Sequence, residues 1–331
     1  MPTLDACAYF PGVSARDLAQ VSHDPADLDR GGRWAVAIGL EGQTVLARFR
    51  EWDEHSPPGA QWRGVTGPWH TSLSRTQYQQ GVRAVQAHIG RGWVYQVNLC
   101  RVLSARCDAE DLLGLHGRLA AMEGAFAGFL HLPEHAVAIA SASPERFLTR
   151  VGDAIWSSPI KGTADHPDRF LPKDRSENIM IVDLVRNDLG RVATTGSVGV
   201  RQLLAVEPYP GLYHLVSTVT ADVAGRSWDE ILAATMPPGS VSGAPKLAAL
   251  DVIRELEPVP RQWYCGAFGW IDVDADRAEL GVAIRTFWLR DATLHFGTGA
   301  GITWGSDPAG EWQETVLKAQ RLIGIADSVA G

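Results

Sequence analysis

The sequence has no excess of basic residues, no long apolar run and few cysteines. Acidic residues (38) outnumber Lys and Arg (30), so the net charge is −8, which argues against a general nucleic-acid or acidic-membrane binder. No apolar run approaches the length that spans a bilayer, and Met1–Asp5 lacks the basic and apolar regions of a signal peptide. The four cysteines (Cys7, Cys100, Cys107 and Cys265) lack metal-ligand spacing. We therefore expect reduced thiols in a cytoplasmic protein.

Lysine is also scarce, because only four of the 30 basic residues are lysines. One of them, Lys161, lies in the stretch Pro159–Thr163 at the end of an alternating, strand-like run. An amine can lose its proton and attack carbon, whereas a guanidinium in practice cannot. A solvated surface lysine is the ordinary alternative. The neighbouring Gly162, which permits close approach of the backbone to a ligand, favours a reactive amine.

The order of predicted elements is mixed, with a helix followed by several strands, repeated. This order favours an α+β fold with antiparallel sheets over regular βαβ alternation, and 331 residues suffice for one large domain or two ordinary ones. Tryptophans in apolar runs are expected to pack in the core. The patterns predict a hairpin over 34–49, helices over 74–90, 108–122, 173–189, 228–235, 246–257 and 308–325, strands over 93–103, 126–158, 197–206, 212–223, 267–271, 278–289 and 293–297, and a tight turn at 299–301.

Two predicted helices each carry a pair of acidic residues at i and i+3. Asp174 and Glu177 share one helix face, and Glu311, Glu314 and Lys318 share another. Taken alone, the second set is best explained as a solvated charged stripe. The two sets together can supply oxygen ligands to one hard cation such as Mg²⁺, which commonly keeps water and an anionic ligand in its other positions.

Three further features suggest a site for a small polyanion. Glu145, next to a proline, is either a turn residue or a general acid or base. Arg285 interrupts an apolar strand and needs an anionic partner, which is either a core carboxylate or a substrate carboxylate. The glycine-rich segment Gly239–Lys246 fails the P-loop spacing, because Leu247 stands where Ser or Thr would hold Mg²⁺. Its backbone amides, like those of Gly299–Gly301, can still hold a carboxylate.

Several motifs follow one another over roughly residues 90 to 326. They are Tyr95–Leu99, Ser141–Phe147, Pro159–Thr163, Asp174–Arg191, Val206–Pro208, His214–Thr218, Gly239–Lys246, Ile284–Thr286, Gly299–Ile302 and Glu311–Thr315. As a set they are highly specific, and their order resembles the chorismate-utilising enzymes, and within them the members that aminate chorismate at C4.

The resemblance implies an α+β layered sandwich of mostly antiparallel sheets flanked by helices, as in anthranilate synthase component I. It implies that residues 1–70 are a short N-terminal part of the same fold, that 71–331 form the chorismate-binding catalytic region, and that both make one compact domain. It implies Mg²⁺ as cofactor, held by Glu177 and Glu314 with Asp174 and Glu311 supporting. The substrate-binding residues that it implies are Gln96, Gly162, Thr163, His214, Ser240, Tyr264, Arg285, Gly299, Ala300, Gly301 and Lys318.

Two positions discriminate between branches of this family. Lys161 is similar to the lysine that attacks ring C2 in the C4-aminating members, whereas the anthranilate-forming members have a small apolar residue there. Gln96 stands where the water-using members carry a basic lysine, and so indicates an ammonia user. Glu145 is then a general acid on the leaving hydroxyl, or a base.

The resemblance also implies a glutamine amidotransferase subunit as the source of ammonia, because this chain shows no glutaminase signature. The product, 4-amino-4-deoxychorismate, leads to 4-aminobenzoate and folate. Two alternatives remain: an anthranilate-forming or aminodeoxyisochorismate-forming relative, and a non-catalytic chorismate-binding subunit. Neither nucleic acid nor membrane is expected as a partner.

Overall fold

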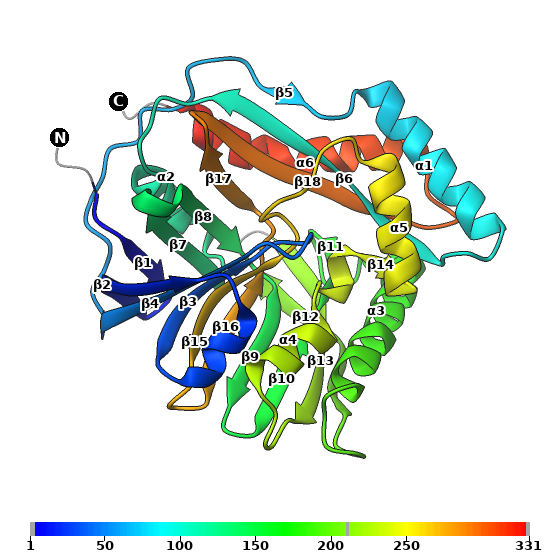
Figure 1. Ribbon diagram of the computed structural model, residues 1–331. Helices are drawn as coiled ribbons and strands as arrows, with labels where there is room; N and C mark the ends of the chain where they lie inside the picture. The colour runs from blue at the N-terminus through cyan, green and yellow to red at the C-terminus, as the bar shows by residue number, and fades with distance from the viewer. Residues whose placement is uncertain (1–3, 210–211, 329–331) are drawn as a thin grey trace.

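The computed structural model describes residues 4–209 and 212–328 and shows an α+β architecture (Figure 1). Residues 1–3 of the predicted N-terminal part, 1–70, lie outside the described residues. The strands are β1 (Cys7–Phe10), β2 (Val13–Ser22), β3 (Arg33–Ile38), β4 (Thr44–Asp53), β5 (His70–Thr71), β6 (Gln96–Arg106), β7 (Phe126–Leu132), β8 (Val137–Ser143), β9 (Arg146–Val151), β10 (Ala154–Ser158), β11 (Ile160–Ala164), β12 (Gly199–Tyr209), β13 (Leu212–Asp222), β14 (Gly243–Ala244), β15 (Ala267–Asp272), β16 (Arg277–Val282), β17 (Thr286–Arg290) and β18 (Thr293–Ile302).

Every pairing between these strands is antiparallel, and the pairings form one continuous order. The order is β6–β18–β17–β8–β7–β1–β2–β4–β3–β15–β16–β9–β10–β13–β12, with β5 and β14 on β6 and β11 on β13. The sheet bends back on itself, so that strands from its two ends face a common region (Figure 1). The N-terminal strands β1 and β3 pair with β7 and β15 and thus belong to the same sheet.

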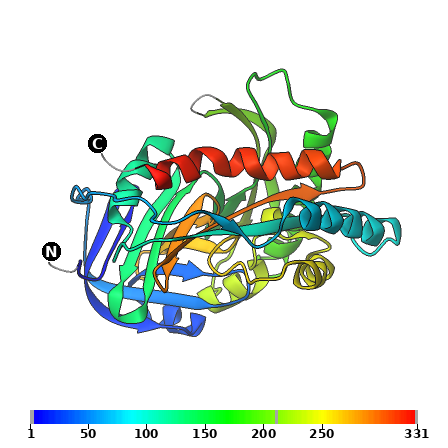
Figure 2. The same ribbon diagram turned by 90° about the horizontal axis from the view of Figure 1, so that it is seen from above.

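Helices cover the outer faces and the two sheet ends. Helices α1 and α6 pack on each other beside β6 and β18 (Figures 1 and 2), α5 packs on β6 and β14, and α3 packs on β11, β12 and β13. No helix within the described ranges is long and apolar enough to cross a membrane. The helices are α1 (Arg75–Gly90), α2 (Leu113–Leu119), α3 (Pro172–Gly190), α4 (Trp228–Thr235), α5 (Lys246–Leu256) and α6 (Pro308–Asp327), with short 3₁₀ turns η1 (Pro25–Arg30), η2 (Ala120–Met122), η3 (Pro133–His135) and η4 (Gly239–Val241).

The buried core is largely aliphatic and aromatic, and it includes four fully buried tryptophans, Trp34, Trp62, Trp228 and Trp288. Burial of this apolar surface is the main stabilising contribution to such a fold. The prediction that tryptophans pack in the core is confirmed for these four, although others, such as Trp304, are exposed.

Local sequence signals predicted most helices and hairpins correctly. Helix α1 begins after Ser74, whose side chain accepts from the Gln77 backbone N–H in a capping box. Helix α4 has the predicted bounds, and the predicted hairpin over 34–49 is formed by β3 and β4. The four cysteines are free and buried.

Three predicted elements were wrong. The helix expected from Asp108 begins only at Leu113, because the Asp111 side chain accepts from the Leu113 N–H and forms a turn there. The strand expected over 278–289 is broken into β16 and β17, because Arg285 has a φ of 51° and leaves the extended conformation.

The expected tight turn at 299–301 is a continuation of β18. Gly299 pairs with Cys100 and Gly301 pairs with Asn98 in β6. These glycines therefore allow close packing rather than a reversal of the chain, since a Cβ on Gly299 would lie 2.4 Å from Cys100 Sγ.

Candidate active site

Lys161 lies at an irregularity in β11. The register between β11 and β13 shifts between Ile160 and Thr163, which leaves Lys161 and Gly162 outside regular pairing. The Lys161 Nζ donates to the Ser240 carbonyl at 2.8 Å. Burial lowers the pKa of Lys161, and the neighbouring carboxylates of Glu145 and Glu177 oppose this shift.

Gly162 is required at its position by both conformation and space. Its φ is +88°, and a Cβ would lie 2.8 Å from the Asp174 Cβ. The glycine therefore lets α3 approach the Lys161 strand. This contact joins two motifs that are far apart in the sequence.

Glu145 occupies the connection between β8 and β9 and is only 4% exposed. Burial raises the pKa of Glu145, while Ser240 and Lys161 act in the opposite direction. Glu145 and Lys161 thus meet at Ser240. A carboxylic acid and an amine whose pKa values are shifted toward each other are typical of an acid–base pair in catalysis.

Gln96 is buried beside Lys161 and lacks hydrogen-bond partners. It is 1% exposed, and neither its side-chain oxygen nor its nitrogen is bonded within the described part of the chain. A Cβ on Gly301 would lie 2.2 Å from Gln96 Nε2 and 3.7 Å from Lys161 Nζ. Gln96, Gly301 and Lys161 therefore converge, and an unpaired buried amide at this point is suited to a polar ligand.

Arg285 leaves its strand and packs over the ring of Tyr209. Its guanidinium carbon lies 5.7 Å from that ring centroid. Burial lowers the pKa of Arg285, and among the residues described here it forms no ion pair with an Asp or Glu. Of the two partners considered above, a core carboxylate is thus not found, which leaves Arg285 available to a ligand carboxylate.

Thr163 and His214 form a polar pair across β11 and β13. Thr163 Oγ1 lies 3.0 Å from His214 Nδ1, and His214 Nε2 is buried without a partner in the described residues. Burial, with a contribution from Arg285, lowers the pKa of His214 to about 4. His214 is therefore neutral near pH 7, and it is suited to hydrogen bonding rather than to charge pairing.

A contact between Lys173 and Glu311 joins helices α3 and α6, which carry the predicted carboxylates. The Lys173 Nζ lies 3.8 Å from Glu311 Oε1, which also accepts from Ser306 Oγ at 2.6 Å. Asp174 caps its own helix by accepting from the Leu171 N–H at 2.8 Å. Burial raises the pKa values of Glu177 and Glu311.

Glu314 differs from these two carboxylates because its pKa is lowered. It lies 2.6 Å from Lys318 Nζ, and although burial raises the pKa of Glu314, Lys318 lowers it below its ordinary value. Lys318 also donates to the Gly299 carbonyl at 3.1 Å, whereas the Ala300 side chain is buried in the core beside β6. Ala300 can contribute only backbone atoms to a ligand.

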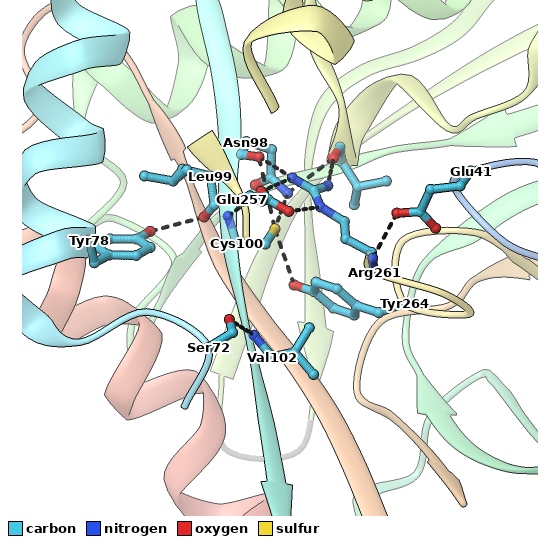
Figure 3. A network of polar contacts seen from close by, with 11 residues as sticks. Glu41, Ser72, Tyr78, Asn98, Leu99, Cys100, Val102, Glu257, Arg261 and Tyr264 are labelled. Carbon is cyan, nitrogen blue, oxygen red and sulfur yellow. Dashed lines mark hydrogen bonds and ion pairs between the residues drawn. The ribbon is translucent and has the colours of Figure 1, made fainter. Parts of the chain in front are cut away.

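Tyr264 is placed in a separate buried network (Figure 3). Its hydroxyl lies 3.9 Å from Cys100 Sγ, and its ring fills the space above Gly297. In the same network Arg261 pairs with Glu257. No hydrogen bond joins Tyr264 to Lys161, Arg285 or Lys318 in the described part of the chain, so its predicted role in substrate binding stays a prediction.

Sequence reasoning missed two residues of this arrangement, Tyr209 and Lys173, and it predicted Ser240 as a substrate contact without its role beside Lys161. The Ser240 carbonyl anchors Lys161, Tyr209 supports Arg285, and Lys173 bridges α3 to Glu311. Only Lys173 carried a usable signal, because the scarcity of lysine that singled out Lys161 applies to it equally. Backbone and aromatic partners of this kind depend on contacts distant in sequence.

The buried carboxylates of α3 and α6 are the candidate ligands for a divalent cation. Within 4–209 and 212–328, no three His, Cys, Asp or Glu side chains form a ready-made metal site. However, Glu177 Oε1 and Glu311 Oε2 are buried without hydrogen-bond partners. Oxygen donors of this kind fit Mg²⁺, which takes few protein ligands and fills its shell with water and an anionic ligand.

Known proteins show which family has this architecture. A family model described as chorismate binding enzyme matches residues 33–324. The aminodeoxychorismate synthase component 1 of Klebsiella aerogenes is 39% identical over 312 residues, covering 88% of this chain and 68% of that protein. Its counterpart in Salmonella typhimurium is 35% identical over 337 residues, covering 95% and 72%. The chain therefore belongs to the chorismate binding enzyme family, as the motifs predicted.

A solved structure confirms the fold class. The menaquinone-specific isochorismate synthase of Escherichia coli matches with a TM-score of 0.85 at 18% identity, covering 98% of this chain and 89% of that one. At this identity the likeness concerns the fold alone. The predicted α+β fold is thus confirmed, whereas the assignment of individual substrate contacts still rests on the motifs.

Proposed function

We propose that this chain is the chorismate-aminating component of an aminodeoxychorismate synthase, which converts chorismate and ammonia to 4-amino-4-deoxychorismate. The observation that carries the proposal is the position of Lys161. Its amine is held by the Ser240 carbonyl next to a buried acid, Glu145, and a buried unpaired amide, Gln96. The similarity to two aminodeoxychorismate synthase components supports the same reaction.

The lowered pKa of Lys161 and the raised pKa of Glu145 suit the two partners of the first step. The neutral Lys161 amine forms a bond to ring C2, the ring double bonds shift, and the C4–oxygen bond breaks. Glu145 gives its proton to the departing hydroxyl, which leaves as water. The amine loses one proton as it becomes the secondary amine of the adduct.

In the second step ammonia is the nucleophile, and Lys161 is the group that leaves. Ammonia forms a bond to C4, the double bonds shift back, and the C2–nitrogen bond to Lys161 breaks. The lysine recovers a proton, and the net change replaces the 4-hydroxyl by an amino group with release of water. Arg285, His214 and Thr163 would hold and orient the dicarboxylate during both steps.

We extend the proposal to Mg²⁺ as cofactor. Glu177 and Glu314 would hold the ion, with Glu311 and Asp174 supporting, and the orphaned oxygens of Glu177 and Glu311 favour this assignment. The bound cation would supply charge neutralisation for a substrate carboxylate. Glu314 would then exchange part of its contact with Lys318 for the metal ion.

We further propose a glutamine amidotransferase subunit as the source of ammonia. The designation "component 1" of the two relatives implies a second component. Free ammonia is a minor species near neutral pH, so delivery by a bound partner would raise its concentration at C4.

The test is to identify the product. The purified chain is supplied with chorismate, Mg²⁺ and ammonium, and the product is analysed by mass spectrometry and by NMR for the position of the amino group. Amination at C4 is expected. Amination at C2 would instead identify an anthranilate-forming or aminodeoxyisochorismate-forming enzyme, and chorismate binding with no turnover would identify a non-catalytic subunit.

A further inference from the structure

Asp188 and Lys246 form a buried ion pair that the reaction above does not use. Asp188 lies on α3 and Lys246 begins α5, and their Oδ2 and Nζ atoms are 2.7 Å apart with side chains that are 8% and 10% exposed. The Lys246 Nζ also donates to the Thr235 carbonyl at 2.9 Å. Desolvation of two buried charges offsets most of their attraction, so such a pair adds little to the stability of the fold. We therefore ask what else this pair does.

A small cavity is lined by Asp188 of this pair and by Glu145. Its volume is about 10 Å³, and its wall includes the two carboxyl-bearing residues Glu145 and Asp188 together with Ser157, Ser240 and Gly239. The rest of the wall is largely apolar, with Phe147, Leu148 and Val185 among its residues. A cavity of about this size holds one water molecule where polar groups such as these carboxylates can bind it. The carboxylate of Asp188 also reaches the turn that carries Ser240, because a Cβ on Gly239 would lie 3.7 Å from Asp188 Oδ2.

Glu145 must regain a proton after each turnover, and its burial restricts proton exchange with solvent. It gives a proton away in every turnover, yet it is only 4% exposed. Lys161, which lies near it, faces the substrate and must stay neutral when it attacks. Two sources can restore this proton: the Lys161 amine, which loses one proton as the adduct forms, and the wall of the cavity, which includes Asp188.

We propose that Asp188 and Lys246 return protons to Glu145 through one water molecule in this cavity, an inference that rests on the proposed role of Glu145 as general acid. The Glu145 carboxylate takes a proton from the water, and the water takes one from the Asp188–Lys246 pair. The pair recovers its proton from solvent. No bond other than those to hydrogen changes, so the step is balanced without a further reactant.

The electrostatics of the pair are consistent with proton exchange near neutral pH. Burial raises the pKa of Asp188 to about 6, with Lys246 and Arg191 opposing, and burial lowers the pKa of Lys246. The charged or titratable groups that face Asp188 are Lys246 from α5, Arg191 from the end of α3 and, across the cavity, Glu145 and Arg146. The uncharged forms of Asp188 and Lys246 are therefore more accessible than those of exposed groups.

The experiment removes both charges at once, since removal of one would leave the other buried and unpaired. The double variant Asp188→Asn with Lys246→Met is compared with the wild type for kcat and KM of chorismate at saturating ammonium, in H₂O and in D₂O. The matched control is Arg150→Met with Asp276→Asn, another ion pair with a buried cation, at 2.8 Å, that does not line the cavity. Thermal melting reports folding of each variant.

A proton relay predicts a specific pattern. The Asp188/Lys246 double variant should lose at least about tenfold in kcat, as expected for impaired general acid catalysis, with KM changed less than about twofold. Its solvent isotope effect on kcat should rise, because proton delivery becomes rate-limiting. The control should melt at a lower temperature but keep the kcat and isotope effect of the wild type.

Several outcomes would overturn the inference. A folded double variant with wild-type kcat, or with reduced kcat and an unchanged isotope effect, would make the pair purely structural. If the double variant does not fold, Asp188→Asn alone is measured in the same way and judged by the same two readouts. Absence of C4 amination by the wild type in this assay would overturn the proposed function and the inference together, whereas normal amination with an unaffected variant would overturn only the inference.

Discussion

At the scale of single residues, the site depends on groups whose ordinary properties are changed by burial. Lys161 is shifted toward the neutral amine, Glu145 toward the neutral acid, and His214 is neutral near pH 7. Burial is the largest cause of the pKa shift of all three groups, because it removes the charged form from water. Residue type singled out Lys161 and Glu145, and the family resemblance indicated His214, but only the fold explains their protonation.

The pH dependence of the reaction follows from the direction of these shifts. The active form needs Lys161 neutral and Glu145 protonated, so kcat/KM should rise with pH as Lys161 loses its proton and fall as Glu145 loses its own. Glu145→Gln should lower kcat by about 10²- to 10⁴-fold and abolish the decline at high pH. The measurement is the pH–rate profile of both proteins, and a variant that retains full turnover would exclude Glu145 as the acid.

Gly162 gives a second prediction at this scale. Gly162→Ala places a Cβ against Asp174 and forces a non-glycine residue to a φ of +88°, so we expect a lower melting temperature and at least about tenfold lower kcat/KM from displacement of Lys161. The matched control is Gly12→Ala, which has a φ of +74° with no atom within 4 Å of the new Cβ. It should lose only the stability that a positive φ costs a non-glycine residue, about 1–2 kcal/mol, and it should keep normal kinetics. Equal kinetic effects in both variants would contradict this account.

At the scale of elements, the site is assembled where irregularities interrupt regular structure. Lys161 lies outside the regular pairing of β11, and Arg285 lies in the break between β16 and β17. The glycines of β18 allow β6 to approach closely. Helical spacing predicted α3 and α6 well, since their faces repeat every three or four residues. The break at Arg285 was not predictable in the same way, because its flanking residues read as one continuous apolar strand.

The two acidic helices give a prediction about the metal ion. Glu177→Gln removes a charged ligand from the proposed Mg²⁺ site, and we expect the Mg²⁺ concentration for half-maximal activity to rise about tenfold or more. Magnesium titrations of turnover and of chorismate binding measure this effect. Glu134→Gln, an exposed substitution in η3, serves as the control and should leave both titrations unchanged. Activity that is independent of Mg²⁺ in the wild type would rule out the metal site.

At the scale of the whole molecule, one antiparallel sheet bends until β6 and β18 at one end meet β11 at the other, where Gln96, Gly301 and Lys161 converge. The motifs, which are dense between about residues 90 and 326, predicted the fold class correctly, and the site residues that they indicate stay predictions. The sequence could not predict the partners that depend on folding. The Ser240 carbonyl, the Tyr209 ring and the Asp188–Lys246 pair each act on residues far away in the chain.

The proposed partner gives a prediction for the assembled enzyme. The chain alone should aminate chorismate with ammonium but not with glutamine, and addition of a glutamine amidotransferase subunit should confer glutamine-dependent turnover. Co-elution in size-exclusion chromatography and rates with each nitrogen source measure this. Glutamine-dependent activity of the isolated chain would contradict the need for a partner.

The central claim is that Lys161 attacks the ring, and trapping of the adduct tests it most directly. The wild-type chain is incubated with chorismate and Mg²⁺ without ammonia, digested and analysed by mass spectrometry. A Lys161 peptide heavier by the mass of chorismate minus one water is predicted, together with loss of both adduct and turnover in Lys161→Ala. Absence of the adduct, combined with unimpaired turnover of Lys161→Ala, would contradict the account.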